Sequence, residues 1–219
     1  MAKLSEIGFS KGIIAETIIS TYSAEGQPNA APMGVTMQDE EHLTVDLFNT
    51  SQTYRNIKAN RCAVINLTFN IEIFYRSAFK ETNPNGNLPA EWFEKSQSVN
   101  APKIRMVEAS IEVLVEHLEL MASRGTMKTR GTLKVESIQA TCVYPQAFSR
   151  ALSLTVEAIL HATRVKALLS DETQQKRIAK LLEVISDCHQ VVNRVAPNSS
   201  YSLVMDDLTK RIEGWRNLK

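Results

Sequence analysis

The sequence predicts an α+β protein in which a small antiparallel β-barrel of about six strands is followed by a segment of three helices. Between residues 13 and 145, short stretches rich in β-branched or alternating apolar residues are separated by turn residues, which favours a closed barrel over a doubly wound sheet. After Pro145 the apolar period changes from two residues to about 3.6, which is typical of helices. We therefore expect a barrel domain at residues 1–145 and a helical domain at residues 146–219.

The first four strands follow one another with short connections. Apolar and β-branched patterns predict strands at residues 13–21, 30–37, 42–48 and 62–69, with a short helix at 52–60 between the third and the fourth. The second strand contains Pro32 and Gly34, which suit a sheet edge, a bulge or a place where a ligand approaches the backbone closely.

Two longer strands complete the predicted barrel. Residues 107–116 alternate, so we expect Val107, Ala109, Ile111, Val113 and Val115 to point inward and Glu108, Ser110, Glu112 and Glu116 to point outward. In residues 130–145 the apolar phase shifts by one residue, which predicts a β-bulge near Ser137.

Three helices are expected in the remainder, at about residues 149–169, at about 172–195 and from beyond Pro197 to the C-terminus. Their predicted apolar faces consist of Leu152, Val156, Ile159 and Leu160 in the first, Ile178, Leu181, Leu182, Ile185, Cys188 and Val192 in the second, and Val204, Leu208, Ile212 and Trp215 in the third.

Composition and charge exclude several classes of protein. The 25 basic and 24 acidic residues leave a formal net charge of +1, without the positive excess that drives binding to DNA or RNA, so no nucleic-acid partner is expected. No apolar run approaches the roughly 20 residues of a membrane span, and the N-terminus lacks the apolar core of a signal peptide, so we expect a cytoplasmic protein without a membrane partner.

Metal and nucleotide motifs are missing as well. The three cysteines lie far apart, and the four histidines share no ligand spacing, so no metal site is predicted. The eight glycines form neither a dinucleotide fingerprint nor a phosphate-binding P-loop, and no zinc-protease or serine-hydrolase motif occurs. The sequence therefore identifies no catalytic residue.

Residues 81–102 contain three prolines and predict a long loop. Its Trp92 and Phe93 either cover a ligand or anchor the loop to its own domain.

The stretch "LFNTSQTYRNI", residues 47–57, places an unusual number of hydroxyl and amide side chains where the third strand leads into the short helix. One of them suffices as a helix N-cap. The surplus, beside unpaired backbone N–H groups and the positive end of the helix dipole, equally suits a phosphate. These residues alone leave the two alternatives open.

The neighbouring second strand favours the phosphate. In "PNAAPMGV", residues 28–35, the small residues Ala30, Ala31 and Gly34 clear the strand surface, and Pro32 removes a backbone donor. A flat ring can lie against such a strand, and a ring beside a phosphate site is what a mononucleotide with a planar heterocycle requires.

These motifs resemble a known family. "G-x-x-N-x-A-P", residues 26–32, "F-N-T-S-x-T-Y-x-N-I", residues 48–57, and "CAVINLT", residues 62–68, are similar to flavin-reductase-like split barrels. "AFSRALSLTVEAILHATRVKAL", residues 147–168, resembles the helical part of the FMN-binding split-barrel family known as domain of unknown function 447. Ser149 departs from the asparagine of that family's F-N-R-A pattern.

The resemblance implies an FMN-binding split β-barrel and a homodimer with FMN near the subunit interface. By motif matching, the isoalloxazine ring is lined by Asn29, Ala30, Ala31, Pro32, Met33, Gly34 and Val35. The phosphate and ribityl chain are contacted by Asn49, Thr50, Ser51, Thr53 and Asn56. Arginines from elsewhere, among them Arg105, Arg130, Arg150 and Arg164, are candidates for neutralising the phosphate. Glu157, His161 and Arg164 share one helix face, either toward the flavin or toward solvent.

Three functions are consistent with this set of features. The first is an FMN-dependent oxidoreductase of unknown substrate, similar to reductases that use NADH or NADPH or another small-molecule donor. The alternative is a non-catalytic FMN carrier or sensor that acts as a dimer. The third is a barrel that has lost its ligand.

Overall fold

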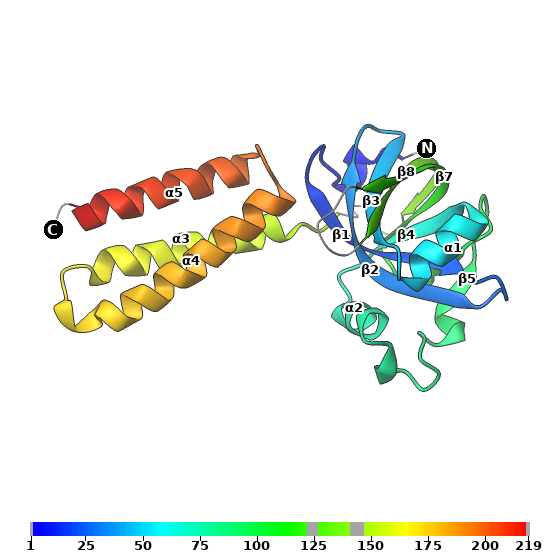
Figure 1. Cartoon of the computed structure of the whole chain (residues 1–219), viewed down its shortest axis with the longest axis horizontal. Coiled ribbons are helices and arrows are strands. Elements are labelled where there is room, and N and C mark those ends of the chain that lie inside the picture. The colour runs from blue at the N-terminus through cyan, green and yellow to red at the C-terminus, as the bar shows by residue number, and fades with distance from the viewer. Residues whose placement is uncertain (1, 122–126, 141–146, 218–219) are drawn as a thin grey trace. The chain divides into compact units, whose positions relative to one another are not determined.

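The computed structural model of the chain describes residues 2–121, 127–140 and 147–217. The chain forms two compact units, Met1–Phe148 and Ser149–Lys219, each with its own core (Figure 1). Within the described residues, none of the helices combines the length and the low polarity that a bilayer span requires.

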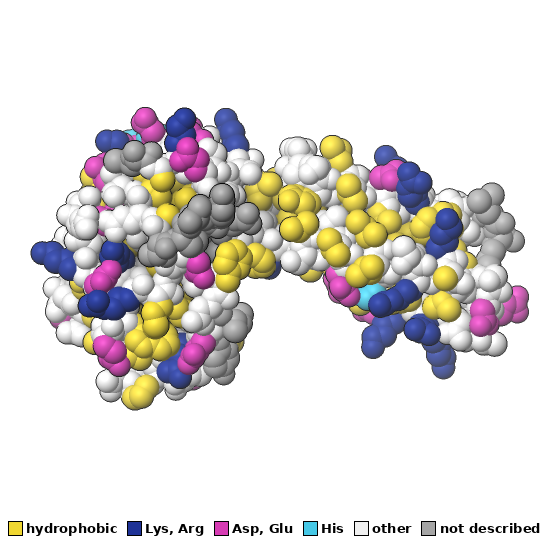
Figure 2. Space-filling view, turned by 180° about the vertical axis from the view of Figure 1, so that it is seen from behind, with side chains coloured by type: hydrophobic (Ala, Val, Ile, Leu, Met, Phe, Trp, Pro, Cys, Tyr) yellow, Lys and Arg dark blue, Asp and Glu magenta, His cyan; other side chains and the backbone are white. Residues whose placement is uncertain are grey.

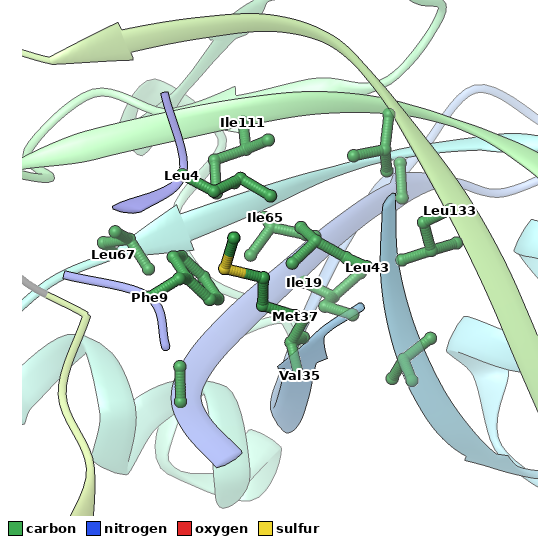
Figure 3. Packing of buried hydrophobic residues seen from close by; sticks show 14 of the residues in the cluster. Leu4, Phe9, Ile19, Val35, Met37, Leu43, Ile65, Leu67, Ile111 and Leu133 are labelled. Atoms are coloured by element: carbon green, nitrogen blue, oxygen red, sulfur yellow. The ribbon is translucent and has the colours of Figure 1, made fainter. Parts of the chain in front are cut away.

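The first unit is a closed antiparallel barrel with the strand order β1-β2-β3-β8-β7-β4, which confirms the predicted fold class. Its strands are β1 (Ile14–Tyr22), β2 (Pro28–Met37), β3 (His42–Phe48), β4 (Cys62–Leu67), β7 (Ala109–Met121) and β8 (Lys128–Ala140). All six pairings are antiparallel. The barrel core receives side chains from every strand, and Leu4 and Phe9 of the N-terminal segment complete it (Figure 3).

The predicted β-bulge is present. Glu112 of β7 pairs with Ser137, whereas the next residue, Val113, pairs with Val135. Glu136 is therefore the extra residue in β8, directly beside the position that the change of apolar phase indicated.

Ser110 and Glu112 alternate with the core residues of β7 and so lie on its outer face, but this face is covered and not open to water. Both are buried, Glu112 completely, because the segment after β5 (Phe93–Lys95) covers this face. The backbone amides of Gln97 and Ser98 donate to the Glu112 carboxylate, at 3.1 and 2.5 Å.

A second layer covers one side of β2. Helix α2 (Ile71–Ala78), which the sequence analysis did not predict, packs there together with a two-stranded sheet of β5 and β6 (Pro102–Ile104). Phe93 is buried in this layer and Trp92 packs against it, so both aromatic residues anchor the predicted loop to its own unit. Short 3-10 turns lie at Ser5–Ile7, Lys80–Thr82 and Ala90–Trp92.

The second unit consists of α3 (Arg150–Leu168), α4 (Gln175–Val195) and α5 (Ser200–Asn217), with a 3-10 turn at Glu172–Gln174. The predicted face of α4 is largely buried. The predicted face of α3 was wrong: Leu152, Val156, Ile159 and Leu160 are all exposed, and small residues form the buried side instead, namely Ala151, Thr155, Ala158, Ala162 and Val165. In α5, Met205 rather than Val204 belongs to the core.

Candidate functional site

The candidate site begins at α1 (Gln52–Asn60), which follows β3 after a tight turn closed by a 2.9 Å hydrogen bond from Ser51 N to the Phe48 carbonyl. Ser51 is the N-cap, and its Oγ accepts a hydrogen bond from Tyr54 N at 3.1 Å. The amides of Gln52 and Thr53 precede the first intrahelical bond, so the helix geometry provides them with no acceptor. One residue therefore caps the helix, and the remaining polar side chains of the stretch are not needed for that purpose.

Two of the predicted site residues, Thr53 and Asn56, belong to a largely buried polar chain that joins α1 to β1 and β2. Thr53 Oγ1 accepts from Asn29 Nδ2 at 3.3 Å. Asn56 Nδ2 donates to Thr21 Oγ1 at 2.9 Å, and Asn56 Oδ1 accepts from Gln52 Nε2 at 2.7 Å. These bonds fix the first turn of α1 against the start of β2, the two segments that the sequence analysis assigned to one ligand.

Lys80 joins the same chain from the turn after α2, and sequence reasoning missed it. Its Nζ donates to Asn29 Oδ1, so the ammonium lies two hydrogen bonds from Thr53. Burial lowers the pKa of Lys80. Within the described residues the Lys80 ammonium donates to a neutral amide oxygen and not to a carboxylate. No local motif marks this lysine, because its contact depends on a pairing across 51 residues.

The other two predicted residues of the turn have different roles. Asn49 Oδ1 accepts from Thr129 Oγ1 at 2.8 Å, which fixes the end of β3 to β8. The Thr50 side chain is exposed, and its carbonyl accepts from Arg55 Nη1 at 2.9 Å. Thr50 and Ser51 thus present hydroxyl groups at the start of the helix.

The residues assigned to the ring lie on both faces of β2. Alternation places Asn29, Ala31, Met33 and Val35 on one face and Ala30, Pro32 and Gly34 on the other. Val35 belongs to the barrel core and Ala30 to the layer beneath α2, whereas Ala31, Pro32 and Met33 are half-buried and Gly34 is exposed. A Cβ on Gly34 would lie 2.6 Å from Cγ2 of Ile14, so packing against β1 already explains this glycine.

The candidate arginines divide between the two units. Arg130 makes a bidentate bond to Asp46, at 2.7 and 3.0 Å, which raises the pKa of the guanidinium. Arg105 is bonded to Glu94 at 3.0 Å. Arg150 and Arg164 lie on α3 of the helical unit, and their assignment to phosphate stays a prediction. Ser149, where the family's pattern has asparagine, caps α3, its Oγ accepting from Ala151 N at 3.3 Å.

The described part of the chain holds two of the three cysteines and a scattered set of other potential metal ligands. It contains no group of three or more His, Cys, Asp or Glu side chains able to hold a metal ion. Burial raises the pKa of the Cys62 and Cys188 thiols, while Cys142 lies outside the described residues.

Comparison with known proteins assigns the family. Residues 15–141 match the family described as "Protein of unknown function (DUF447) N-terminal domain". The chain belongs to this family. The resemblance found in the sequence is thereby confirmed, and no curated protein matches the chain.

Two solved structures extend the comparison. The FMN-bound DUF447 protein MM1853 from Methanosarcina mazei is 24% identical, with a TM-score of 0.53 over 94% of this chain and 98% of that one. Nitrilotriacetate monooxygenase component B from Bacillus cereus is 14% identical, with a TM-score of 0.50 over 65% of this chain and 79% of that one. At these identities the likeness establishes the fold, a split barrel, for this DUF447 chain.

Proposed function

We propose that this DUF447 protein binds FMN where β2 meets α1 and that it is an FMN-dependent oxidoreductase. The observation that carries the proposal is Lys80, a half-buried cation bonded to a neutral amide beside the first turn of a helix. A structural lysine is normally left in water or paired with a carboxylate. A cation held in this way is suited to a negatively charged group of a ligand.

The donor set fits a phosphate. Thr50 and Ser51 offer hydroxyl groups, the first turn of α1 offers backbone amides, and Lys80 offers a positive charge. Thr53 Oγ1 accepts from Asn29 and therefore retains its own proton for donation. In this assignment Asn56 acts indirectly, by holding the helix in place through Thr21.

The neighbouring strand fits a planar ring. The half-buried residues Ala31, Pro32 and Met33 present little polar side-chain surface, so backbone groups are the polar partners for a ring that lies along β2. Val35 and Ala30 act only through their backbone and their packing, because their side chains belong to the two cores.

The chemistry follows from a division of labour between cofactor and protein. Bound FMN would accept a hydride from a reduced donor such as a nicotinamide and pass electrons to a second substrate. The described polar chain consists of amides, hydroxyls and one ammonium, so the protein's part is to bind and orient. The Methanosarcina protein, FMN-bound and matched over nearly the whole chain, supports FMN as the cofactor.

The same site suits a second candidate, an FMN carrier or sensor without turnover. The homodimer with FMN near the subunit interface, implied by the family resemblance, is part of both proposals.

The visible absorption spectrum of the purified protein, before and after titration with FMN, tests the proposal. We expect flavin absorption bands and quenching of FMN fluorescence on binding; a protein that takes up no FMN contradicts both candidates. Stopped-flow mixing of the loaded protein with NADH or NADPH then separates them, since an oxidoreductase is reduced by a physiological donor and reoxidised by an acceptor, and dithionite serves as the chemical control that reduces the flavin in either case.

A further inference from the structure

Helix α3 has a second apolar face that its own unit leaves exposed. Leu152 is 56% exposed, Val156 47%, Ile159 38% and Leu160 47%. The buried face of the same helix, centred on Ala158 and Ala162, packs against α4 and α5. A helix that is apolar on both sides is typical of one that packs on both sides. Figure 2 shows hydrophobic side chains gathered over one face of the helical unit.

This exposed face, defined here as the α3 stripe, carries no charged side chain along its length, all of which lies in the described part of the chain. Its members recur at spacings of three and four residues: Leu152, Ser153, Val156, Ile159, Leu160, Thr163 and Ala167. The Thr163 hydroxyl is bonded to the Leu160 carbonyl at 2.8 Å, so it adds no unpaired donor to the stripe. Such spacing lets the side chains of one helix fit between those of another.

The charges beside the α3 stripe are arranged for a second copy of the same helix. Glu157 and Arg164 are seven residues apart, nearly two turns, so they flank the stripe on the same side. Their midpoint, between Leu160 and His161, lies close to the midpoint of the stripe. When two antiparallel copies meet about a two-fold axis there, Glu157 of each copy faces Arg164 of the other.

The contacts that Glu157 and Arg164 make within the described residues do not prevent this pairing. Glu157 Oε1 lies 3.1 Å from His161 Nε2, and Arg164 Nη1 lies 3.4 Å from His161 Nδ1. Both charged side chains are exposed, and within the described residues their side-chain contacts are to His161 and not to a Lys, Arg, Asp or Glu side chain. An apolar surface of another protein would form no ion pair with Glu157 or Arg164. A second, antiparallel copy of α3 pairs both of them, because it presents Arg164 to Glu157 and Glu157 to Arg164.

We propose that the α3 stripe is a self-association surface, on which α3 of a second copy packs antiparallel about a two-fold axis, with reciprocal Glu157–Arg164 pairs at its edge. The inference concerns the helical unit alone and does not depend on flavin binding.

Sedimentation velocity over a range of concentrations tests the surface. Leu160→Glu is expected to weaken self-association by at least about tenfold, because it places a charge in an apolar contact. Leu120→Glu, at a leucine of β7 that is 60% exposed, is the matched control and is expected to leave the association constant unchanged. Circular dichroism and FMN titration of each variant report folding and the proposed flavin site separately.

Charge reversal tests the orientation. Glu157→Arg and Arg164→Glu are each expected to weaken association several-fold, since each places like charges opposite one another. The double variant, E157R with R164E, is expected to restore it. A monomeric wild-type protein, an unaffected Leu160→Glu variant, a dimer broken by Leu120→Glu instead, or a double variant no better than its parents would overturn the proposal.

Discussion

Glu112 on β7 lies wholly away from water and Lys80 after α2 lies partly so, and the first unit surrounds these two charges differently. Glu112 is fully buried and accepts from Gln97 N, Ser98 N and the Gln139 side chain at 2.5 to 3.3 Å. Lys80 is half-buried and donates to one amide oxygen. The Glu112 carboxylate is thus saturated, because the protein itself supplies its hydrogen-bond donors. The Lys80 ammonium is open, because it keeps N–H donors that a ligand can use. We infer that the first charge serves the fold and the second a ligand.

Removing the saturated charge should have the largest effect on stability. Glu112→Ala removes a completely buried carboxylate together with its bonds from Gln97 N and Ser98 N, and it is expected to lower the free energy of unfolding by about 3–5 kcal/mol. Urea denaturation measures this change, with Glu116→Ala, at an exposed carboxylate, as the control expected to stay within about 0.5 kcal/mol. A loss below about 1 kcal/mol would contradict a structural role for Glu112.

Giving the open Lys80 ammonium a carboxylate partner should have the next largest effect, on the affinity for FMN. Asn29→Asp gives Lys80 a carboxylate partner and repels a phosphate, so FMN affinity is expected to fall by roughly fiftyfold. Riboflavin, which lacks the phosphate, is the matched ligand and should bind with unchanged affinity. Fluorescence titration measures both. Equal losses for the two flavins would show that Asn29 supports the ring or the fold instead.

Removing the Lys80 ammonium should have a smaller effect on the affinity for FMN. Lys80→Met keeps much of the side-chain volume and removes the ammonium, so we expect FMN affinity to fall by about tenfold, again with riboflavin unaffected. Lys80→Arg should retain most of the affinity. If Lys80→Met binds FMN as the parent does, the phosphate lies elsewhere.

The smallest expected effect is on pH dependence. Burial lowers the folded-state pKa of Lys80, so the charged form is disfavoured in the folded protein. Between the folded and the unfolded pKa the unfolded chain binds more protons, and the stability of the flavin-free protein should rise with pH in that window. Lys80→Met removes the charge, so the variant should have a higher free energy of unfolding than the parent protein at neutral pH. This difference should shrink as the pH is raised toward the pKa of Lys80 in the unfolded chain. A difference in the free energy of unfolding between variant and parent that does not change with pH would contradict a destabilising effect of the buried Lys80 charge.

Part of the site was predictable because part of it is local. A strand that ends at Phe48 and a serine three residues before Tyr54 define the helix cap, and these signals lie within one turn of chain. Lys80 and Asn29 were not predictable as a pair, because 51 residues separate them and neither belongs to a motif that names the other. Helix α2, which carries the chain toward Lys80, is rich in β-branched and aromatic residues and becomes a helix where Ile73 packs beneath β2.

The sequence by itself determined the order of the elements and the change from barrel to helices, because periods of two and of about 3.6 residues are properties of neighbouring positions. It also determined the bulge beside Ser137, since a shift of apolar phase within one strand is local. Only the tertiary structure decided which apolar face of α3 is buried, because small residues allow close packing and leave the leucines outside. It also decided that Glu112 is saturated and Lys80 is not, since each depends on segments that approach only when the barrel closes and its second layer packs.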